Sequence, residues 1–222
     1  MHANFYIIYL RVSSHFMTDL LVALDTPNEL DTKGWNINFR QLVTPKRGVH
    51  PYHYFRDELY ESPDKKFACL FYTINEYRMG SEAGLIGIFV NKNKPTLLAN
   101  PKNQWFDYQG DRSLIFSDNF LFLRKLADNQ NEKLSGTPFV VFDLINRTFC
   151  FIDFDATSIY YSLVKVEKST YKLNLDTPEE IKHITLPNRH GQTYDLTTFK
   201  YYAFGELDKI MELYFDEKEN GC

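Results

Sequence analysis

Residues Thr137–Asp155 read TPFVVFDLINRTFCFIDFD. They predict two apolar strands joined by Asn146 and Arg147, a two-residue loop whose asparagine tolerates the positive φ that a tight hairpin turn requires. Both faces of the predicted ribbon are mostly apolar, whereas a strand pair with one wet face alternates apolar and polar residues. The hairpin is therefore expected to lie between two packed layers. The predicted cross-strand pairs are Leu144–Phe149, Phe142–Phe151 and Val140–Asp153 on one face, and Asp143–Cys150, Val141–Ile152 and Phe139–Phe154 on the other.

Length and composition indicate a globular, β-rich chain. With 222 residues it forms one large domain or two small ones, and we expect a single β-rich domain over residues 1–222. Residues 1–16 read as an extension or an edge strand, and residues 177–222 as a peripheral C-terminal segment. The 19 Phe and 15 Tyr favour strands and fill cores, although an AT-biased codon usage would produce the same enrichment.

Charge and cysteine content restrict the expected partners and compartment. The formal net charge of −4 lacks the basic surplus that binding to a phosphate backbone needs, so nucleic acid is not an expected partner. The apolar run at residues 3–10 ends at Arg11, well short of membrane-spanning length, so no membrane association is expected. Cys69 and Cys150 lie in apolar strands and Cys222 ends the chain, without metal-type spacing, which favours a reducing, cytoplasmic location.

The remaining elements are read from periodicity and turn residues. Residues 52–60 are ambiguous between a strand and helical turns, and residues 187–195 are expected to be loop. Pro178 is expected at the first position of a short helix, and Glu206–Asp216 places Leu207, Ile210, Met211 and Tyr214 on one helical face. Strands are expected at residues 18–25, 35–39, 67–77, 85–90, 96–99, 113–116, 120–126, 162–166, 171–175 and 198–204. The predicted fold is mainly β, with antiparallel hairpins in a curved sheet, a sandwich or a small propeller-like arrangement, and a C-terminal amphipathic helix.

One short phrase resembles a repeat family. Ser62–Ala68, SPDKKFA, is similar to the turn-plus-strand phrase of β-propeller blades, and Ser117–Leu121 is a looser echo of it. The resemblance implies blades packed on both faces, which suits the central hairpin. A closed propeller needs at least four blades, which is a tight fit in 222 residues, so a curved meander or sandwich is the preferred arrangement.

A second phrase resembles a catalytic motif. Residues 153–157, DFDAT, match the DxDxT phrase of haloacid-dehalogenase-like phosphotransferases. The resemblance implies Asp153 as nucleophile and Asp155 as general acid/base beside Mg²⁺. The chain departs from the family because a hairpin precedes the phrase instead of a parallel strand and because no convincing later lysine or acidic metal-binding motif follows. The alternative is a pair of carboxylates that bond loop amides at a strand end.

Histidines and loop aromatics supply the other candidate sites. His50 and His53 are candidate metal ligands, but Pro51 disfavours the helix that would align them, and two surface imidazoles are the alternative. No cofactor is expected. Aromatics beside carboxylates and an arginine in a polar loop are typical of contact surfaces, although these rings could also pack against the sheet. The candidate binding residues are Trp105, Tyr108 and Arg112 in one loop and Tyr77 and Arg78 in another.

The leading functional hypothesis is a non-catalytic intracellular protein-interaction module that binds another protein. A toxin-neutralising immunity-type protein would fit such a chain. Two alternatives stay open: a Mg²⁺-dependent phosphoryl-transfer enzyme that uses Asp153 and Asp155, and a carbohydrate-binding module that uses exposed Trp and Tyr side chains.

Overall fold

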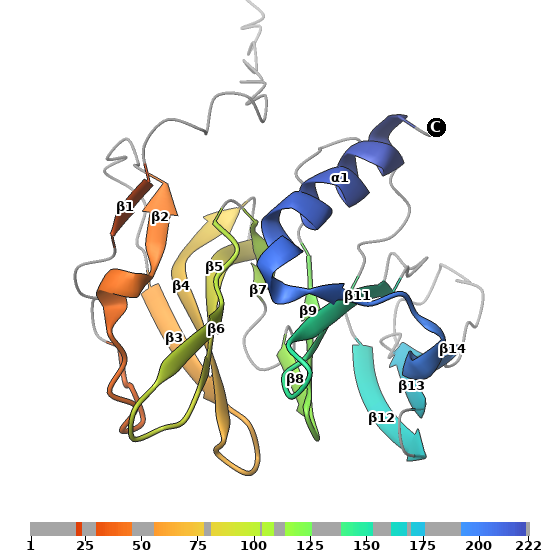
Figure 1. The fold of residues 1–222 in the computed structure, drawn as a ribbon, viewed down its shortest axis with the longest axis horizontal. Coiled ribbons are helices and arrows are strands. Elements are labelled where there is room, and N and C mark those ends of the chain that lie inside the picture. The colour runs from red at the N-terminus through yellow and green to blue at the C-terminus, as the bar shows by residue number, and fades with distance from the viewer. Residues whose placement is uncertain are drawn as a thin grey trace, which may run out of the picture.

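The described part of the chain is mainly β (Figure 1). Every strand pair in it is antiparallel. The structure is a computed structural model. It describes residues 21–23, 30–45, 56–77, 81–102, 104–108, 114–125, 139–152, 161–167, 170–175 and 192–220. The predicted fold class, antiparallel β with a C-terminal helix, is confirmed. Residues 1–16, at which an extension or an edge strand was expected, lie outside the described residues.

The first sheet has the strand order β3-β4-β5-β6 and gains a fifth strand where β7 pairs with β5. The long strand β5 pairs with both β7 and β6. Residues near its start pair with β7, and its last residues pair with β6. The strands are β3 (Arg56–Glu61), β4 (Phe67–Tyr77), β5 (Ser81–Val90), β6 (Thr96–Ala99) and β7 (Phe106–Tyr108).

The second sheet has the order β15-β11-β10-β9-β8, so the predicted hairpin forms two of its three inner strands. The chain therefore places its most apolar ribbon where both ladder edges are paired. The strands are β8 (Leu114–Ser117), β9 (Phe120–Arg124), β10 (Phe139–Asp143), β11 (Thr148–Ile152) and β15 (Tyr202–Ala203).

The other elements lie outside these two sheets. A two-stranded sheet pairs β1 (Leu21–Ala23) with β2 (Val43–Pro45), and a three-stranded sheet contains β12 (Tyr161–Glu167), β13 (Thr170–Leu175) and β14 (Gln192–Asp195). The helical elements are η2 (Phe39–Gln41), η3 (Leu196–Thr198), η4 (Phe204–Glu206) and α1 (Leu207–Asn220).

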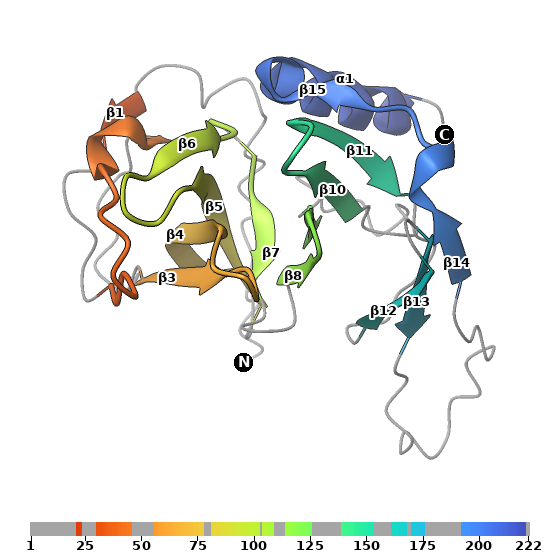
Figure 2. The same cartoon turned by 60° about the horizontal axis from the view of Figure 1, so that its bottom comes forward.

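Strand β7 joins the two five-stranded sheets. Phe106 pairs with Gly84 in β5 and also forms an antiparallel bridge with Lys125, the residue directly after β9. Figure 2 shows β7 between the two sheets, which face one another. The described strands thus form a curved, sandwich-like arrangement whose sheets are not closed into a barrel.

Three apolar clusters hold these layers together. The inner core lies between the two sheets, the first outer cluster covers the far face of the first sheet, and the second outer cluster covers the far face of the second. The inner core contains Phe67, Cys69, Phe71, Ile74, Ile86, Ile88, Ala99, Phe106, Tyr108, Leu114, Leu121, Leu123, Val140, Phe142, Leu144, Phe149, Phe151, Leu207 and Met211. The first outer cluster contains Trp35, Ile37, Leu42, Leu59, Ala68, Leu70, Tyr72, Leu85 and Phe89, and the second contains Phe122, Phe139, Val141, Cys150, Ile152 and Leu196.

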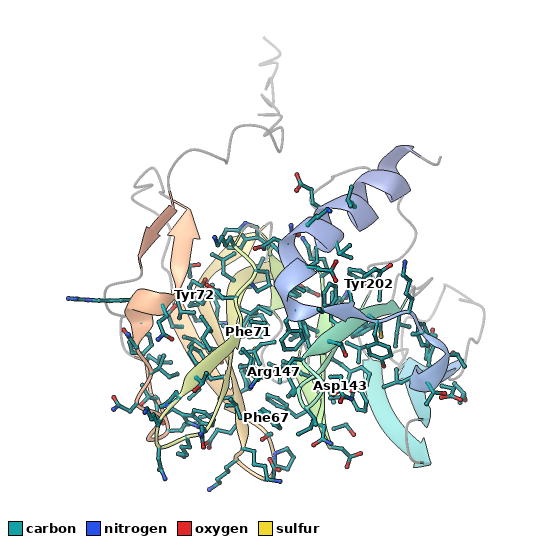
Figure 3. The ribbon with its side chains drawn as sticks, in the orientation of Figure 1. Phe67, Phe71, Tyr72, Asp143, Arg147 and Tyr202 are labelled. Carbon is teal, nitrogen blue, oxygen red and sulfur yellow. The ribbon has the colours of Figure 1, made fainter. Side chains whose placement is uncertain are left out.

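The central hairpin is buried on both faces, as its sequence predicts. Val140 and Phe142 face the inner core, whereas Phe139 and Val141 face the second outer cluster. The first sheet shows the same alternation: Phe71 packs in the inner core and Tyr72 in the first outer cluster, and both residues are labelled in Figure 3.

The loop of this hairpin differs from the prediction. Asp143 pairs with Thr148, so the loop has four residues, and the positive φ of 56° belongs to Arg147 rather than to Asn146. The cause is the Asp143 carboxylate. Its Oδ1 accepts hydrogen bonds from the amides of Ile145 (3.2 Å) and Asn146 (3.0 Å), and its Oδ2 accepts one from Asn146 Nδ2 (2.8 Å). An aspartate that caps its own turn in this way stabilises the longer loop.

The six predicted cross-strand pairs are therefore wrong by two residues. Phe142 pairs with Phe149 rather than with Phe151. Because side chains on a strand alternate with a period of two, the slip leaves each one on its predicted face. The observed pairs are Phe139–Ile152, Val140–Phe151, Val141–Cys150, Phe142–Phe149 and Asp143–Thr148.

Several other elements correct the predictions. Residues 35–38 pair with no strand in the described part of the chain, and Phe39 begins the helical turn η2. Trp35 and Ile37 pack on the first outer cluster instead of entering a ladder. Of the strand predicted at residues 198–204, only Tyr202–Ala203 is paired. Strands β7 and β14 lie in segments predicted as loops, and the ambiguous residues 52–60 supply β3.

Strand β4 contains a bulge at Thr73. The ladders on both sides of β4 shift by one residue near Thr73, whose φ is 51°. Asp57 Oδ1 accepts a hydrogen bond from the Thr73 amide at 2.7 Å. Because of the extra residue, Phe71 and Ile74 both face the inner core although they are three positions apart.

Helix α1 closes one end of this core, as the amphipathic pattern predicts. Leu207 and Met211 are buried in it and Ile210 is half-buried, whereas the helix runs four residues beyond the predicted end at Asp216. In the described part of the chain, no helix combines the length and hydropathy that crossing a bilayer takes.

Candidate binding surface

Five side chains from three strands of the first sheet form a cluster at the margin of the inner core. They are Arg56, Glu58, Tyr60, Glu82 and Tyr108, and we call them the Arg56 cluster. Strand alternation puts Arg56, Glu58 and Tyr60 on one face of β3. Glu82 pairs with Tyr108 across β5 and β7, which brings the other two side chains to the same region.

The two tyrosines form the floor of the cluster, where Tyr108 is buried and Tyr60 is partly buried. Their rings meet Phe71 edge-on, with centroids 6.2 Å away for Tyr60 and 5.2 Å for Tyr108. Their hydroxyls lie 2.9 Å apart, and the Tyr60 hydroxyl donates a hydrogen bond to Glu58 Oε2 at 2.7 Å. Burial, and then these hydrogen bonds, raise the pKa of Tyr60 above its ordinary value, and burial followed by Glu58 does the same to the pKa of Tyr108. Both phenols are therefore neutral at pH 7.

Arg56 forms the outer part of the cluster. Its guanidinium carbon lies 5.0 Å from the centroid of the Tyr108 ring, and it pairs with Glu82 and, at 3.6 Å, with Glu58. The Arg56 side chain is nevertheless 50% exposed. A surface ion pair contributes only about 0–1 kcal/mol, so these contacts matter mainly because they hold the guanidinium in one position.

This geometry defines the chemistry that the cluster can perform. A neutral phenol with a raised pKa donates or accepts hydrogen bonds but does not act as a base at pH 7. One face of the Tyr108 ring is covered by Arg56, and the Nζ of Lys33 lies 5.6 Å from the Tyr60 ring centroid. The exposed guanidinium edge and the two carboxylates are therefore the groups that a ligand would meet.

The sequence-predicted binding residues are placed differently from one another. Trp105 is half-buried and packs against the first outer cluster, whereas Tyr108 is buried on the inner side of the same sheet. Tyr77 ends β4 and pairs with Ser81. The other candidate residues lie outside the described residues: Arg78, Arg112, His50, His53, Asp153 and Asp155.

The sheet nevertheless brings together one residue from each of the two predicted binding loops, Tyr77 and Tyr108. Glu82 pairs with Glu76 on one side and with Tyr108 on the other. Tyr77, which pairs with Ser81, and Tyr108 thus lie at neighbouring positions of one sheet, close to the Glu82 partner Arg56. The sequence predicts Tyr77 and Tyr108 as binding residues in separate loops, and the strand register places them on either side of the start of β5.

Sequence reasoning missed Arg56, Glu58, Tyr60 and Glu82. Residues 52–60 gave no clear period, and the stretch from Arg56 to Glu61 is strongly polar for a strand. The available clue was Leu59, the single buried residue of this strand, flanked by polar residues on the opposite face.

A second ion pair, between Arg124 and Asp107, lies at the junction of the two sheets. Arg124 Nη1 lies 3.3 Å from Asp107 Oδ2, and both side chains are largely buried where β7 meets β9. Burial raises the pKa of Asp107, and the nearby Arg124 opposes that rise. The pair neutralises two charges inside the joint and explains why Asp107 occupies a strand with three buried residues.

Over the described ranges, no three His, Cys, Asp or Glu side chains come together as metal ligands would. A comparison of the chain with protein-family models, with curated proteins and with solved structures finds no match in any of the three. The propeller resemblance of Ser62–Ala68 therefore stays a prediction, although its turn and the following strand β4 do form.

Proposed function

We propose that this protein is a non-catalytic interaction module that binds a partner protein through the Arg56 cluster. The observation that carries the proposal is a half-exposed arginine fixed on a buried tyrosine by two carboxylates. Arginine and tyrosine are enriched among the residues that dominate the energy of protein interfaces. A side chain already held in one position loses less conformational entropy when a partner binds.

The neutral state of the two phenols supports binding rather than catalysis at this cluster. Neither Tyr60 nor Tyr108 has the lowered pKa that a nucleophile or base needs near neutral pH. The Tyr108 ring is 2% exposed and lies under Arg56, so stacking on a sugar ring is not the interaction we propose here.

The cysteines support a reducing, cytoplasmic location. Cys69 and Cys150 are free and buried. Burial raises the pKa of both thiols, that of Cys150 to about 12, so both stay protonated at neutral pH. A toxin-neutralising immunity protein is one class of cytoplasmic interaction module, and we keep it as the specific form of the proposal.

Affinity capture with a matched control tests the proposal. The wild-type protein, Arg56→Ala and Arg40→Ala are each immobilised and exposed to a lysate of the source cells, and Kd is then measured for the purified partner. Arg40 is an exposed arginine outside the cluster. Arg56→Ala should weaken partner binding about 10-fold or more, as truncation of a dominant interface residue does, and Arg40→Ala should leave Kd unchanged.

Two results would overturn the proposal. One is a partner that binds Arg56→Ala as tightly as wild type. The other is Mg²⁺-dependent hydrolysis of a phosphomonoester by the intact protein that disappears in Asp153→Asn, which would establish the phosphoryl-transfer alternative.

A further inference from the structure

Three turns at one end of the first sheet bring five lysines together, and we call them the lysine turn surface. They are Lys33, Lys65, Lys66, Lys92 and Lys94. Backbone hydrogen bonds close the turns, from the Trp35 amide to Thr32 (2.8 Å), from Lys65 to Ser62 (2.8 Å) and from Lys94 to Asn91 (3.0 Å). This concentration is unusual in a chain whose formal net charge is −4.

Specific contacts hold the three turns side by side. The Asn91 amide donates to the Lys66 carbonyl at 3.1 Å, which joins two of the turns. Glu61 Oε1 accepts hydrogen bonds from Trp35 Nε1 and from Lys92 Nζ, both at 2.7 Å, which joins the third. The surface is thus built on fixed backbone rather than on independent flexible loops.

The carboxylates within this surface are already engaged by their own neighbours. Asp31 accepts from the Lys33 amide at 2.9 Å, and Asp64 accepts from Ser62 Oγ at 2.7 Å and lies 2.9 Å from Lys66 Nζ. By contrast, the exposed Lys65 and Lys94 form no ion pair with any residue that the structure describes. Their charges are available to a ligand.

Two of the lysines occupy backbone positions that suit other residues better. Lys33 has a φ of 51° and Lys65 a φ of 57°, where glycine or asparagine meets less steric strain. Turn geometry alone therefore does not account for a lysine at either position.

The lysine turn surface is continuous with the Arg56 cluster. Lys33 covers the Tyr60 ring, and Tyr60 in turn bonds to Glu58. Strand β3 has six residues and is about 20 Å long, so both surfaces fit within one interface of about 800 Å² per partner.

We propose that the lysine turn surface binds an acidic segment of the partner protein, with carboxylates pairing to Lys65 and Lys94. This inference rests on the proposed function. An acidic polypeptide fits better than a nucleic acid because Glu61 and Asp64 alternate with the lysines and would repel a continuous row of phosphates. A polypeptide presents separate carboxylates that can avoid them.

The test uses a fluorescent oligoglutamate as probe at low salt, with oligothymidylate of equal charge and phosphatidylserine vesicles as the other arms. Lys65→Asn with Lys94→Gln removes two charges, and asparagine tolerates the positive φ of residue 65. This double variant should weaken oligoglutamate binding about 2- to 30-fold, and about 0.3 M salt should abolish binding to wild type. Lys102→Gln with Lys209→Gln, which changes two exposed lysines elsewhere, should alter Kd less than about two-fold.

Each other outcome removes the inference. No binding of oligoglutamate by wild type, or equal weakening by both double variants, shows that the surface has no specific role. Tighter binding of oligothymidylate or of vesicles assigns it to another class of ligand. The proposed function fails separately: a natural partner lost by Arg56→Ala but bound normally by the Lys65/Lys94 variant leaves the module intact and refutes only the acidic segment.

Discussion

Replacing Asp143 by alanine removes the three hydrogen bonds that its carboxylate accepts in the turn of the central hairpin. They reach Ile145 N (3.2 Å), Asn146 N (3.0 Å) and Asn146 Nδ2 (2.8 Å), and Asp143 is only 8% exposed. A hydrogen bond to a charged group contributes about 1.5–3 kcal/mol and a neutral one about 0.5–1.5 kcal/mol, and the 3.2 Å bond is the weakest of these. The exposed turn amides regain water in the variant, so we expect Asp143→Ala to lower the free energy of unfolding by about 2–3 kcal/mol in total.

Asp143→Asn is the matched variant, because its amide oxygen can still accept from the two backbone amides. We expect Asp143→Asn to lower the free energy of unfolding by about 1 kcal/mol, because a neutral acceptor replaces a charged one. Urea denaturation monitored by circular dichroism measures both values. If both variants lose less than about 0.5 kcal/mol, or if they lose the same amount, the carboxylate does not determine the four-residue loop and the explanation of the hairpin register is wrong.

Three further predictions concern packing and ionisation. Gly87→Ala should destabilise by about 1–3 kcal/mol, because a Cβ there would lie 2.7 Å from Leu42 Cδ2, whereas Gly205→Ala, with nothing within 4 Å, should be neutral or slightly stabilising in the same urea titrations. The pKa of Asp64 is lowered to about 2, first by its hydrogen bond with Lys66, so the ionised carboxylate stabilises the fold above about pH 4 and this stabilisation is lost as the pH falls toward 2. Asp64→Asn should flatten the fall of Tm over that range, and an unchanged slope would contradict this. The pKa of Tyr60 is raised, so the stabilisation that the neutral phenol provides is complete below about pH 10 and is lost as the pH rises beyond it. Tyr60→Phe should reduce the alkaline loss of Tm, and an identical alkaline profile would count against the Tyr60–Tyr108 hydroxyl pair.

The sequence predicts the class of this fold because hydrophobic periodicity reports which faces are buried. The hairpin over Phe139–Ile152 and the apolar face of Leu207 and Met211 are confirmed for that reason. Periodicity does not report register, which depends on the Asp143 side chain. It also does not distinguish a paired strand from a segment that packs on a sheet without pairing, as at Trp35.

Short elements and assembled sites are beyond the reach of periodicity. Strand β7 has three residues and contains Asp107, whose charge is balanced by Arg124 from a distant part of the chain. The Arg56 cluster likewise exists only because register brings Glu82 and Tyr108 to β3. Tyr108 was chosen from the sequence as a surface contact, and the structure places it as the buried support of the exposed Arg56.

Hydrogen–deuterium exchange of the protein with and without its captured partner tests the central claim, that the edge formed by β3 is the site of contact. We expect added protection at Arg56–Glu61 and at the start of β5, with no change at the hairpin of β10 and β11, which is already buried on both faces. Protection that leaves β3 unchanged and appears at a different surface would contradict the account.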